Sequence, residues 1–272
     1  MTTRSLPPIP SLLPGAEPFF FRGGAAGCLC LHGLSASPDE VRWLGEHLAD
    51  QGLTVYGPRL PCHGGDYRDL RRVRWEDWYR AALDGYHILR AQCSQVFVAG
   101  LSMGGLLALL LATAQPVDAL VVMAAPLKLP DARLMPLARW IKHFQPFVDA
   151  SDRSTFPEHL RSERARRGEV VRGRVRYDRW ASRAVEELHK LMQVVDLRLS
   201  DVNTPTLLLY SAADTTVPIG NQHYLSARLS RIHVETATFQ ESGHILTQDR
   251  EHTEVIRQAG DFLLRHVRTE SC

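Results

Sequence analysis

Short, continuous apolar segments alternate with longer amphipathic ones through most of the 272-residue chain. A strand with one solvent-exposed face alternates between apolar and polar residues, whereas these segments are apolar at successive positions, as in strands covered on both faces. We therefore expect a mostly parallel central sheet flanked by helices, an α/β fold. The expected strands are Gly27–Leu31, Leu53–Tyr56, Gln95–Ala99, Ala119–Met123, Pro205–Tyr210 and Arg231–Thr236, and the expected helices are Asp39–Gln51, Trp75–Arg90, Met103–Ala114 and Arg250–His266.

The alternation stops between residues 127 and 203, where no strand is evident. Apolar residues with helical spacing occur twice in this segment, which predicts two amphipathic helices. They are Leu134, Leu137, Ala138, Ile141 and Val148 in the first, and Val185, Leu188, Met192 and Val195 in the second. We expect residues 127–203 to form a helical cap (lid) inserted into a core of residues 1–126 and 204–272.

The expected cap contains an arginine-rich stretch, residues 161–179, with eight arginines and three acidic residues. Such a stretch suggests phosphate, nucleic-acid or membrane-surface binding, or a solvated face with local ion pairs. We favour the solvated face. Aromatic residues are not interleaved with the arginines, so no nucleic-acid partner is expected.

Five cysteines, an odd number without CxxC or metal-ligand spacing, predict free thiols in a reducing compartment. The proline-broken N-terminus does not resemble a signal peptide, and the longest apolar run, residues 106–112, is too short to span a bilayer. The formal net charge of +2 does not by itself indicate a polyanionic partner. We expect a soluble cytoplasmic protein without an integral membrane segment.

The stretch VFVAGLSMGGLLALLLA, residues 96–112, places Gly100-Leu101-Ser102-Met103-Gly104 between an expected strand and an expected helix. This G-x-S-x-G arrangement is typical of a nucleophile elbow, in which the serine occupies a tight, strained turn and the glycines leave room for the turn to close. The helix that follows adds free N–H groups and a positive dipole end. Ser102 is therefore the candidate nucleophile.

A serine hydroxyl needs a base and an acid that orients the base, and in this topology the chain order is serine, acid, histidine. Among the five histidines that follow the expected cap, His244 alone lies in a loop after the last expected strand. Asp214 follows the strand before it, whereas Asp201 and Asp118 precede their strands and so lie at the opposite edge of the sheet. We predict Asp214 as the acid and His244 as the base.

Two backbone N–H groups are needed to stabilise the oxyanion of a tetrahedral intermediate. One is the N–H of Met103, directly after the nucleophile. The other candidate is the N–H of Leu34, in the turn after the first buried strand, where Gly33 allows close approach. His32 precedes the elbow in the chain and is interpreted as a structural residue of this turn.

The chain resembles the α/β-hydrolase superfamily, and within it small bacterial carboxylesterases and monoacylglycerol lipases with a short helical cap. The resemblance rests on LHGLSASPDE, VYGPRLPCHGG, WEDWY, VFVAGLSMGGLLAL, SAADTTVP and SGHILTQD, in the family's order from about residue 27 to the C-terminus. It implies a Ser102–Asp214–His244 triad with the Leu34 and Met103 amides as the oxyanion hole. Cys62 departs from the family, which more often has glycine there, and this departure affects a loop near the mouth of the active site.

The resemblance implies hydrolysis of a small-molecule carboxylic ester through an acyl-enzyme, without a cofactor or metal. We expect short to medium acyl chains, but this preference is not taken from the family, because the arginine-rich part of the expected cap is unusual. A monoacylglycerol lipase is the alternative from the same class. The same triad also serves serine perhydrolases, thioesterases and peptidases, which differ from esterases in the shape of the pocket. A non-catalytic binding protein on a hydrolase scaffold is the alternative from another class, but it would have a broken triad. We expect a monomer or a homodimer.

Overall fold

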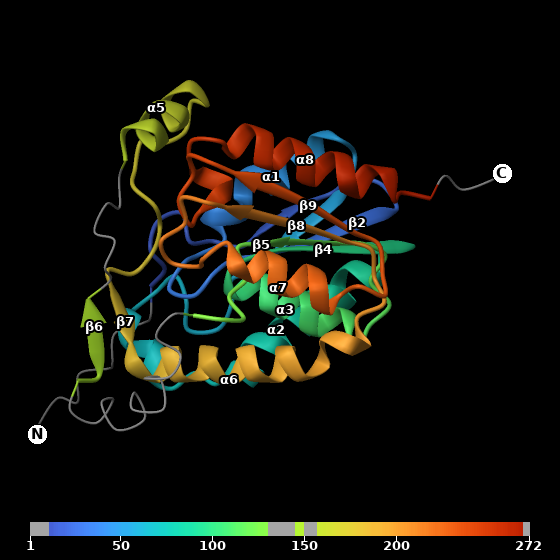
Figure 1. The fold of residues 1–272 in the computed structure, drawn as a ribbon. Helices are drawn as coiled ribbons and strands as arrows, with labels where there is room; N and C mark the ends of the chain where they lie inside the picture. Colours follow the sequence, from blue (N-terminus) through green and yellow to red (C-terminus); the bar gives the residue numbers. More distant parts are fainter. Residues whose placement is uncertain (1–10, 130–144, 150–156, 269–272) are drawn as a thin grey trace, which may run out of the picture.

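The computed structural model describes residues 11–129, 145–149 and 157–268. A seven-stranded sheet in the order β1-β3-β2-β4-β5-β8-β9 occupies its centre (Figure 1). All neighbouring strands are parallel except β1 and β3, which are antiparallel. The strands are β1 (Phe19–Phe21), β2 (Ala26–Leu31), β3 (Thr54–Gly57), β4 (Gln95–Leu101), β5 (Leu120–Met123), β8 (Thr206–Ser211) and β9 (Val234–Phe239).

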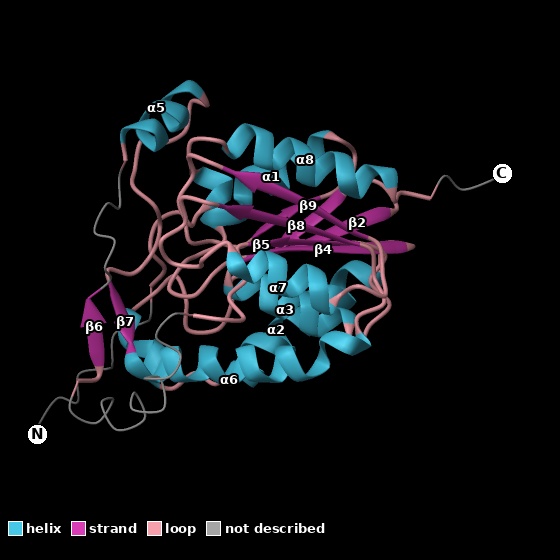
Figure 2. Ribbon diagram, in the orientation of Figure 1, coloured by secondary structure: helices cyan, strands magenta, loops and turns pink. Residues whose placement is uncertain are grey.

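Helices cover both faces of this sheet (Figure 2). Helices α1 (Asp39–Asp50) and α8 (His252–Arg265) lie on one face, and α2 (Trp75–Arg90), α3 (Met103–Ala112) and α7 (Gly220–Arg228) lie on the other. Every residue of β4, β5 and β8 is buried, as their continuous apolar composition predicts. The expected α/β fold is confirmed, and each expected strand and helix outside residues 127–203 is present with boundaries shifted by a few residues.

The segment between β5 and β8 does not continue the alternation of sheet strands and helices seen in the rest of the fold. It contains β6 (Phe147–Asp149), α5 (Glu158–Arg166), β7 (Arg179–Ala181) and α6 (Ser182–Arg198). Strands β6 and β7 pair antiparallel as a separate two-stranded sheet. The expectation of no strand in residues 127–203 was therefore wrong, because three-residue strands are too short to produce a visible alternation.

The two helices expected in this segment have different outcomes. The second is α6, which contains all four of the residues listed for it and packs on α2 and α3. Of the first, residues 134–141 lie outside the described residues, and Val148 belongs to strand β6 rather than to a helix. In Figure 1, α6 runs beneath α2 and α3. Glu163 of α5 lies 3.5 Å from His252 of α8, so the segment contacts both layers of helices.

Three short 3-10 helices complete the described elements: η1 (Tyr67–Arg71), η2 (Leu199–Asp201) and η3 (Leu246–Gln248). No described helix is both long and apolar enough to cross a membrane. The carboxyl ends of the parallel strands meet at one edge of the sheet, where α/β proteins place their ligands. That edge carries the candidate site.

Candidate active site

Ser102 occupies the turn between β4 and α3 with φ 56° and ψ −117°. A positive φ is unfavourable for a residue with a side chain, and it occurs here at a sharp strand-to-helix turn. The Ser102 N–H donates to the Met123 carbonyl at 2.8 Å, which attaches the turn to the neighbouring strand β5. The strained conformation is thus held by the sheet, and it presents the hydroxyl at the carboxyl edge.

Two glycines of the G-x-S-x-G motif are required by close backbone approach. A Cβ atom at Gly100 would lie 2.1 Å from the Gly104 carbonyl oxygen, and one at Gly104 would lie 2.1 Å from the Leu31 carbonyl oxygen. Neither distance is compatible with a side chain, because the opposing atoms belong to the backbone. The motif therefore allows β4, α3 and the end of β2 to meet directly beneath the serine.

The structure brings Ser102, His244 and Asp214 together from three loops at this edge. His244 Nε2 lies 3.0 Å from Ser102 Oγ, and His244 Nδ1 lies 2.8 Å from Asp214 Oδ2. Because an ionised carboxylate only accepts hydrogen bonds, Nδ1 carries the proton and Nε2 is left to accept from the serine hydroxyl. This geometry suits a serine activated by an imidazole base.

Asp214 is held by the turn that follows β8. Its Oδ1 accepts from the N–H groups of Thr216 at 2.7 Å and Val217 at 2.9 Å. Burial by itself would raise the pKa of Asp214, but the hydrogen bond and charge of His244 and the two backbone donors outweigh burial and lower that pKa. The carboxylate is therefore ionised at neutral pH and oriented toward the imidazole.

The loop that carries His244 is fixed by the carboxylate of Glu251. This carboxylate accepts from the backbone N–H groups of Gln240, Glu241 and Ser242 at 3.1, 3.0 and 2.8 Å. The hydroxyl of Ser211 donates to the Ser242 carbonyl, which joins the loop to the end of β8. The base is thus placed by contacts that lie outside the short motif around it.

The predicted oxyanion donors lie on either side of Ser102. A Cβ atom at Gly33 would lie 3.4 Å from the Ser102 Cβ, so the Gly33–Leu34 turn lies against the nucleophile. Among the described residues, no acceptor is found for the N–H groups of Leu34 and Met103. Both donors are therefore available at the rim where an oxyanion would form.

His32 connects this turn to the loop after β3. The Leu60 N–H donates to His32 Nε2 at 3.1 Å, so Nδ1 carries the proton and donates to the Gly33 carbonyl at 2.9 Å. Burial lowers the pKa of His32 well below its ordinary value, and the charge of His63 lowers it further. A neutral, fully bonded imidazole agrees with a structural role.

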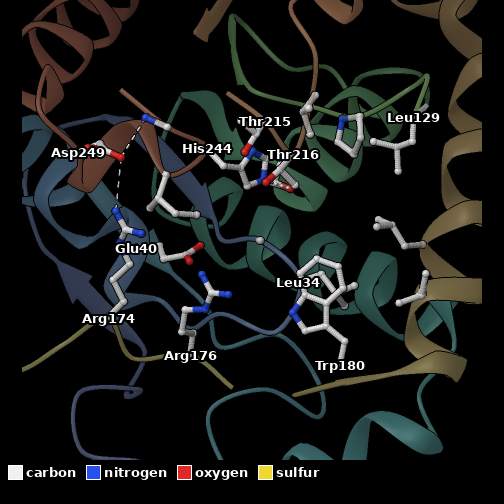
Figure 3. Close-up of a pocket in the computed structure, with 18 residues that line it drawn as sticks. Leu34, Glu40, Leu129, Arg174, Arg176, Trp180, Thr215, Thr216, His244 and Asp249 are labelled. Carbon is white, nitrogen blue, oxygen red and sulfur yellow. Dashed lines mark hydrogen bonds and ion pairs between the residues drawn. The ribbon is translucent and has the colours of Figure 1, made fainter. Parts of the chain in front are cut away.

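A cavity of about 470 Å³ opens beside Ser102 and His244 (Figure 3). One part of its wall is apolar, and Leu34, Leu129, Trp180 and Leu188 contribute to it. Another part carries four charged residues: Glu40, Arg174, Arg176 and Asp249. Most of the apolar wall and both arginines come from the segment between β5 and β8.

The sequence did not predict these charged residues as part of the site. Glu40 is the second residue of α1, and α1 begins at the carboxyl edge after β2, so its first turn faces the site. That topological rule was the available signal for Glu40. Arg174 and Arg176 have no such signal, because they reach the cavity from an irregular segment.

The expectation of a solvated arginine face was wrong for part of the stretch. Arg164 has a side chain that is 1% exposed, and it binds Asp39 of α1 at 2.6 Å and Glu169 at 2.7 Å. Its guanidinium also lies 5.5 Å from the ring centroid of Trp43. Arg166, in contrast, is 70% exposed and pairs with Glu163 of the same helix, as expected.

Cys62, where the family more often has glycine, has φ 65°. This is the left-handed region that favours glycine, which explains the preference at this position. The Cys62 carbonyl accepts from the Tyr177 hydroxyl at 3.1 Å, and the same hydroxyl accepts from the Gly65 N–H at 2.9 Å. The loop is thereby tied to the segment between β5 and β8.

Within the described ranges, no group of three or more histidine, cysteine or acidic side chains has the arrangement of a metal site.

Comparison with known proteins gives a consistent assignment. The family described as serine aminopeptidase, S33 matches residues 25–251. A thermostable monoacylglycerol lipase of Bacillus sp. (strain H-257) is 29% identical over 257 residues, covering 94% of this chain and 97% of the lipase. A carboxylesterase of Bacillus subtilis (strain 168) is 25% identical over 250 residues, covering 91% of this chain and 96% of the esterase.

Among solved structures, a metagenome-derived lipolytic enzyme from a study of LipS and LipT is 25% identical, with a TM-score of 0.80. The match covers 94% of this chain and 100% of that one. The match therefore extends over most of the chain and is not limited to the sheet.

Proposed function

Because this chain belongs to the serine aminopeptidase S33 family of α/β-hydrolases, we propose that Ser102, His244 and Asp214 are the catalytic residues of a carboxylic ester hydrolase. The observation that carries this proposal is the continuous hydrogen-bonded relay from Asp214 through His244 to Ser102, at 2.8 and 3.0 Å. The names of the two Bacillus relatives, a monoacylglycerol lipase and a carboxylesterase, support esters as the substrates.

The reaction proceeds in two steps. His244 Nε2 accepts the proton of Ser102 as the hydroxyl oxygen attacks the ester carbonyl, and Asp214 stabilises the imidazolium that forms. The tetrahedral oxyanion is held by the N–H groups of Leu34 and Met103. His244 then protonates the leaving alcohol, and a water molecule activated by the same imidazole releases the acid and regenerates Ser102.

The main candidate is a carboxylesterase for short to medium acyl chains, and a monoacylglycerol lipase is the second. The lipase is supported by sequence identity, which is 29% to the Bacillus lipase and 25% to the Bacillus carboxylesterase. The apolar part of the cavity wall is compatible with both, since either substrate has an aliphatic acyl chain. Residues 127–203 are proposed as the cap that forms this wall.

A cytoplasmic location is proposed because Cys28, Cys30, Cys62 and Cys93 carry free thiols, as is usual in a reducing compartment. The partner is the small-molecule ester, and no nucleic acid is expected. A monomer or a homodimer would both leave the site complete, because each proposed catalytic residue comes from one chain.

The experiment compares hydrolysis of p-nitrophenyl esters from acetyl to palmitoyl by the wild type and by Ser102→Ala. A fall in kcat of about 10⁴-fold or more in the variant is expected, because the nucleophile is lost. Equal rates in the two proteins would remove the proposal. Octanoyl monoacylglycerol and alanine p-nitroanilide, assayed in parallel, separate esterase, lipase and aminopeptidase activity.

A further inference from the structure

Two neighbouring buried acids begin α1, and they have different surroundings. Asp39 Oδ2 accepts from Arg164 Nη2 at 2.6 Å and from Gln248 Nε2 at 3.1 Å. Glu40 is 2% exposed, yet its Oε2 has no hydrogen-bond partner among the described residues. The burial of the Asp39 carboxylate is therefore explained by its bonds to Arg164 and Gln248, whereas the burial of Glu40 Oε2 is not explained by any such bond.

The backbone of Glu40 is fixed on both sides. Its N–H donates to the Ser37 carbonyl at 3.1 Å, and its carbonyl accepts from the Thr247 hydroxyl. Its Oε2 would lie 3.4 Å from a Cβ atom at Gly33, which places it beside the proposed oxyanion turn. The side chain lines the cavity together with Ser102 and His244 (Figure 3).

A buried carboxylate oxygen without a donor is unfavourable, because it loses its hydration without a replacement. Burial raises the pKa of Glu40, while the charges of Arg176 and Arg174 oppose that rise. The same end of the cavity thus offers both acceptors and guanidinium donors. Neutral hydroxyl groups, which donate and accept, complement this mixture, whereas the arginines disfavour an ammonium group and Glu40 disfavours an anion.

The two parts of the wall also orient an ester. The apolar part suits the aliphatic acyl chain, which leaves the charged part for the alcohol. The leaving alcohol oxygen must lie near His244 to receive its proton. Glu40 lines the same cavity as His244 and belongs to its charged part, where that alcohol is expected.

We propose that Glu40 is a specificity-determining residue that accepts a hydrogen bond from a free hydroxyl group on the alcohol part of the ester. Preferred substrates are then monoesters of diols or polyols rather than of simple alcohols. This inference rests on the proposed function, since it assumes that the cavity binds esters for attack by Ser102.

The test measures kcat/KM for three esters with one acyl chain: glyceryl monooctanoate, propyl octanoate and octanoylcholine. The alcohol part carries free hydroxyl groups in the glyceryl ester, no further polar group in the propyl ester and a quaternary ammonium group in the choline ester. The proteins are the wild type, Glu40→Leu and Glu40→Gln. Asp50→Asn, an exposed acid at the other end of α1, is the matched control.

The wild type is expected to prefer the glyceryl over the propyl ester by about 10- to 100-fold, the range for a hydrogen bond to a charged group. Glu40→Leu removes this preference, Glu40→Gln retains part of it because the amide oxygen still accepts, and Asp50→Asn leaves it unchanged. Thermal unfolding is recorded for each variant, and if Glu40→Leu does not fold, Glu40→Gln carries the test.

Three results overturn the inference. The first is that the preference for the glyceryl ester persists in Glu40→Leu. The second is that kcat/KM falls by the same factor for all three esters, as a purely structural role of Glu40 predicts. The third is that the wild type prefers the choline ester and the variants lose that preference. Failure of the proposed function differs from all of these, because wild type and Ser102→Ala would then hydrolyse each ester equally.

Discussion

The loops at the carboxyl edge of the sheet and the segment between β5 and β8 line one cavity, but they are held in different ways. Ser102, Asp214 and His244 lie in loops that directly follow strands, and hydrogen bonds that involve backbone groups of these loops hold them. The Thr216 and Val217 N–H groups, for example, donate to the Asp214 carboxylate. The intervening segment is attached through long-range side-chain contacts. The Arg164–Asp39 ion pair, for example, joins residues 125 positions apart.

This difference indicates which region of the molecule determines the reaction and which determines the choice of substrate. The edge of the sheet supplies reacting groups on loops that directly follow the strands. The intervening segment supplies wall residues such as Trp180 and Arg176. Buried side-chain contacts such as the Arg164–Asp39 ion pair attach this segment to the core. Changes at the edge should therefore alter the reaction itself, and changes in the contacts of the segment should alter stability and substrate choice.

The largest expected effect is at the edge. Asp214→Asn should lower kcat by about 10⁴-fold, because an amide in place of the carboxylate favours the wrong histidine tautomer and no longer stabilises the imidazolium. The kcat for a p-nitrophenyl ester measures the effect. Asp201→Asn is the control, since Asp201 is exposed and precedes β8, and comparable losses in both variants would contradict the proposed role of Asp214.

The next effect concerns the attachment of the segment. Arg164→Met should destabilise the protein by about 3–5 kcal/mol, because it leaves Asp39 buried without its counter-charge. Urea unfolding measures the change in the free energy of unfolding. Arg166→Met, on the same helix but with an exposed pair, should change stability little. A loss of similar size in the two variants would show that burial of Arg164 does not matter.

A buried histidine in the loop after β3, His63, should make the stability of the protein depend on pH. Burial lowers the pKa of His63 from 6.5 to about 4, so between these pH values the unfolded chain binds a proton that the folded chain does not. The contribution of His63 to the free energy of unfolding is therefore fully present above pH 6.5. It is lost as the pH decreases toward 4, and the loss is on the order of 3 kcal/mol. Urea unfolding at several pH values measures the slope.

His63→Asn is the matched variant, because the asparagine amide can replace the hydrogen bond from His63 Nδ1 to the Pro61 carbonyl without titrating. Its stability should depend less on pH over the same window. An unchanged slope would assign the acid sensitivity to other groups.

The smallest effect tests the steric basis of the elbow. Gly104→Ala should destabilise the protein by about 1–3 kcal/mol, since its Cβ would lie 2.1 Å from the Leu31 carbonyl oxygen. Gly220→Ala, at the start of α7, meets no atom within 4 Å and should leave stability unchanged or slightly higher. Equal thermal stability of the two variants would show that β2 and α3 can separate without cost.

The sequence by itself predicted the parallel sheet, the elbow at Ser102 and the loops that carry Asp214 and His244. It could do so because strand burial and glycine requirements are local properties, and because parallel strands place their following loops at one edge. The tertiary structure alone decided that Arg164 is buried, that β6 and β7 pair and that Arg174 and Arg176 line the cavity. These outcomes depend on contacts between residues far apart in the chain, whose free energy no local pattern encodes.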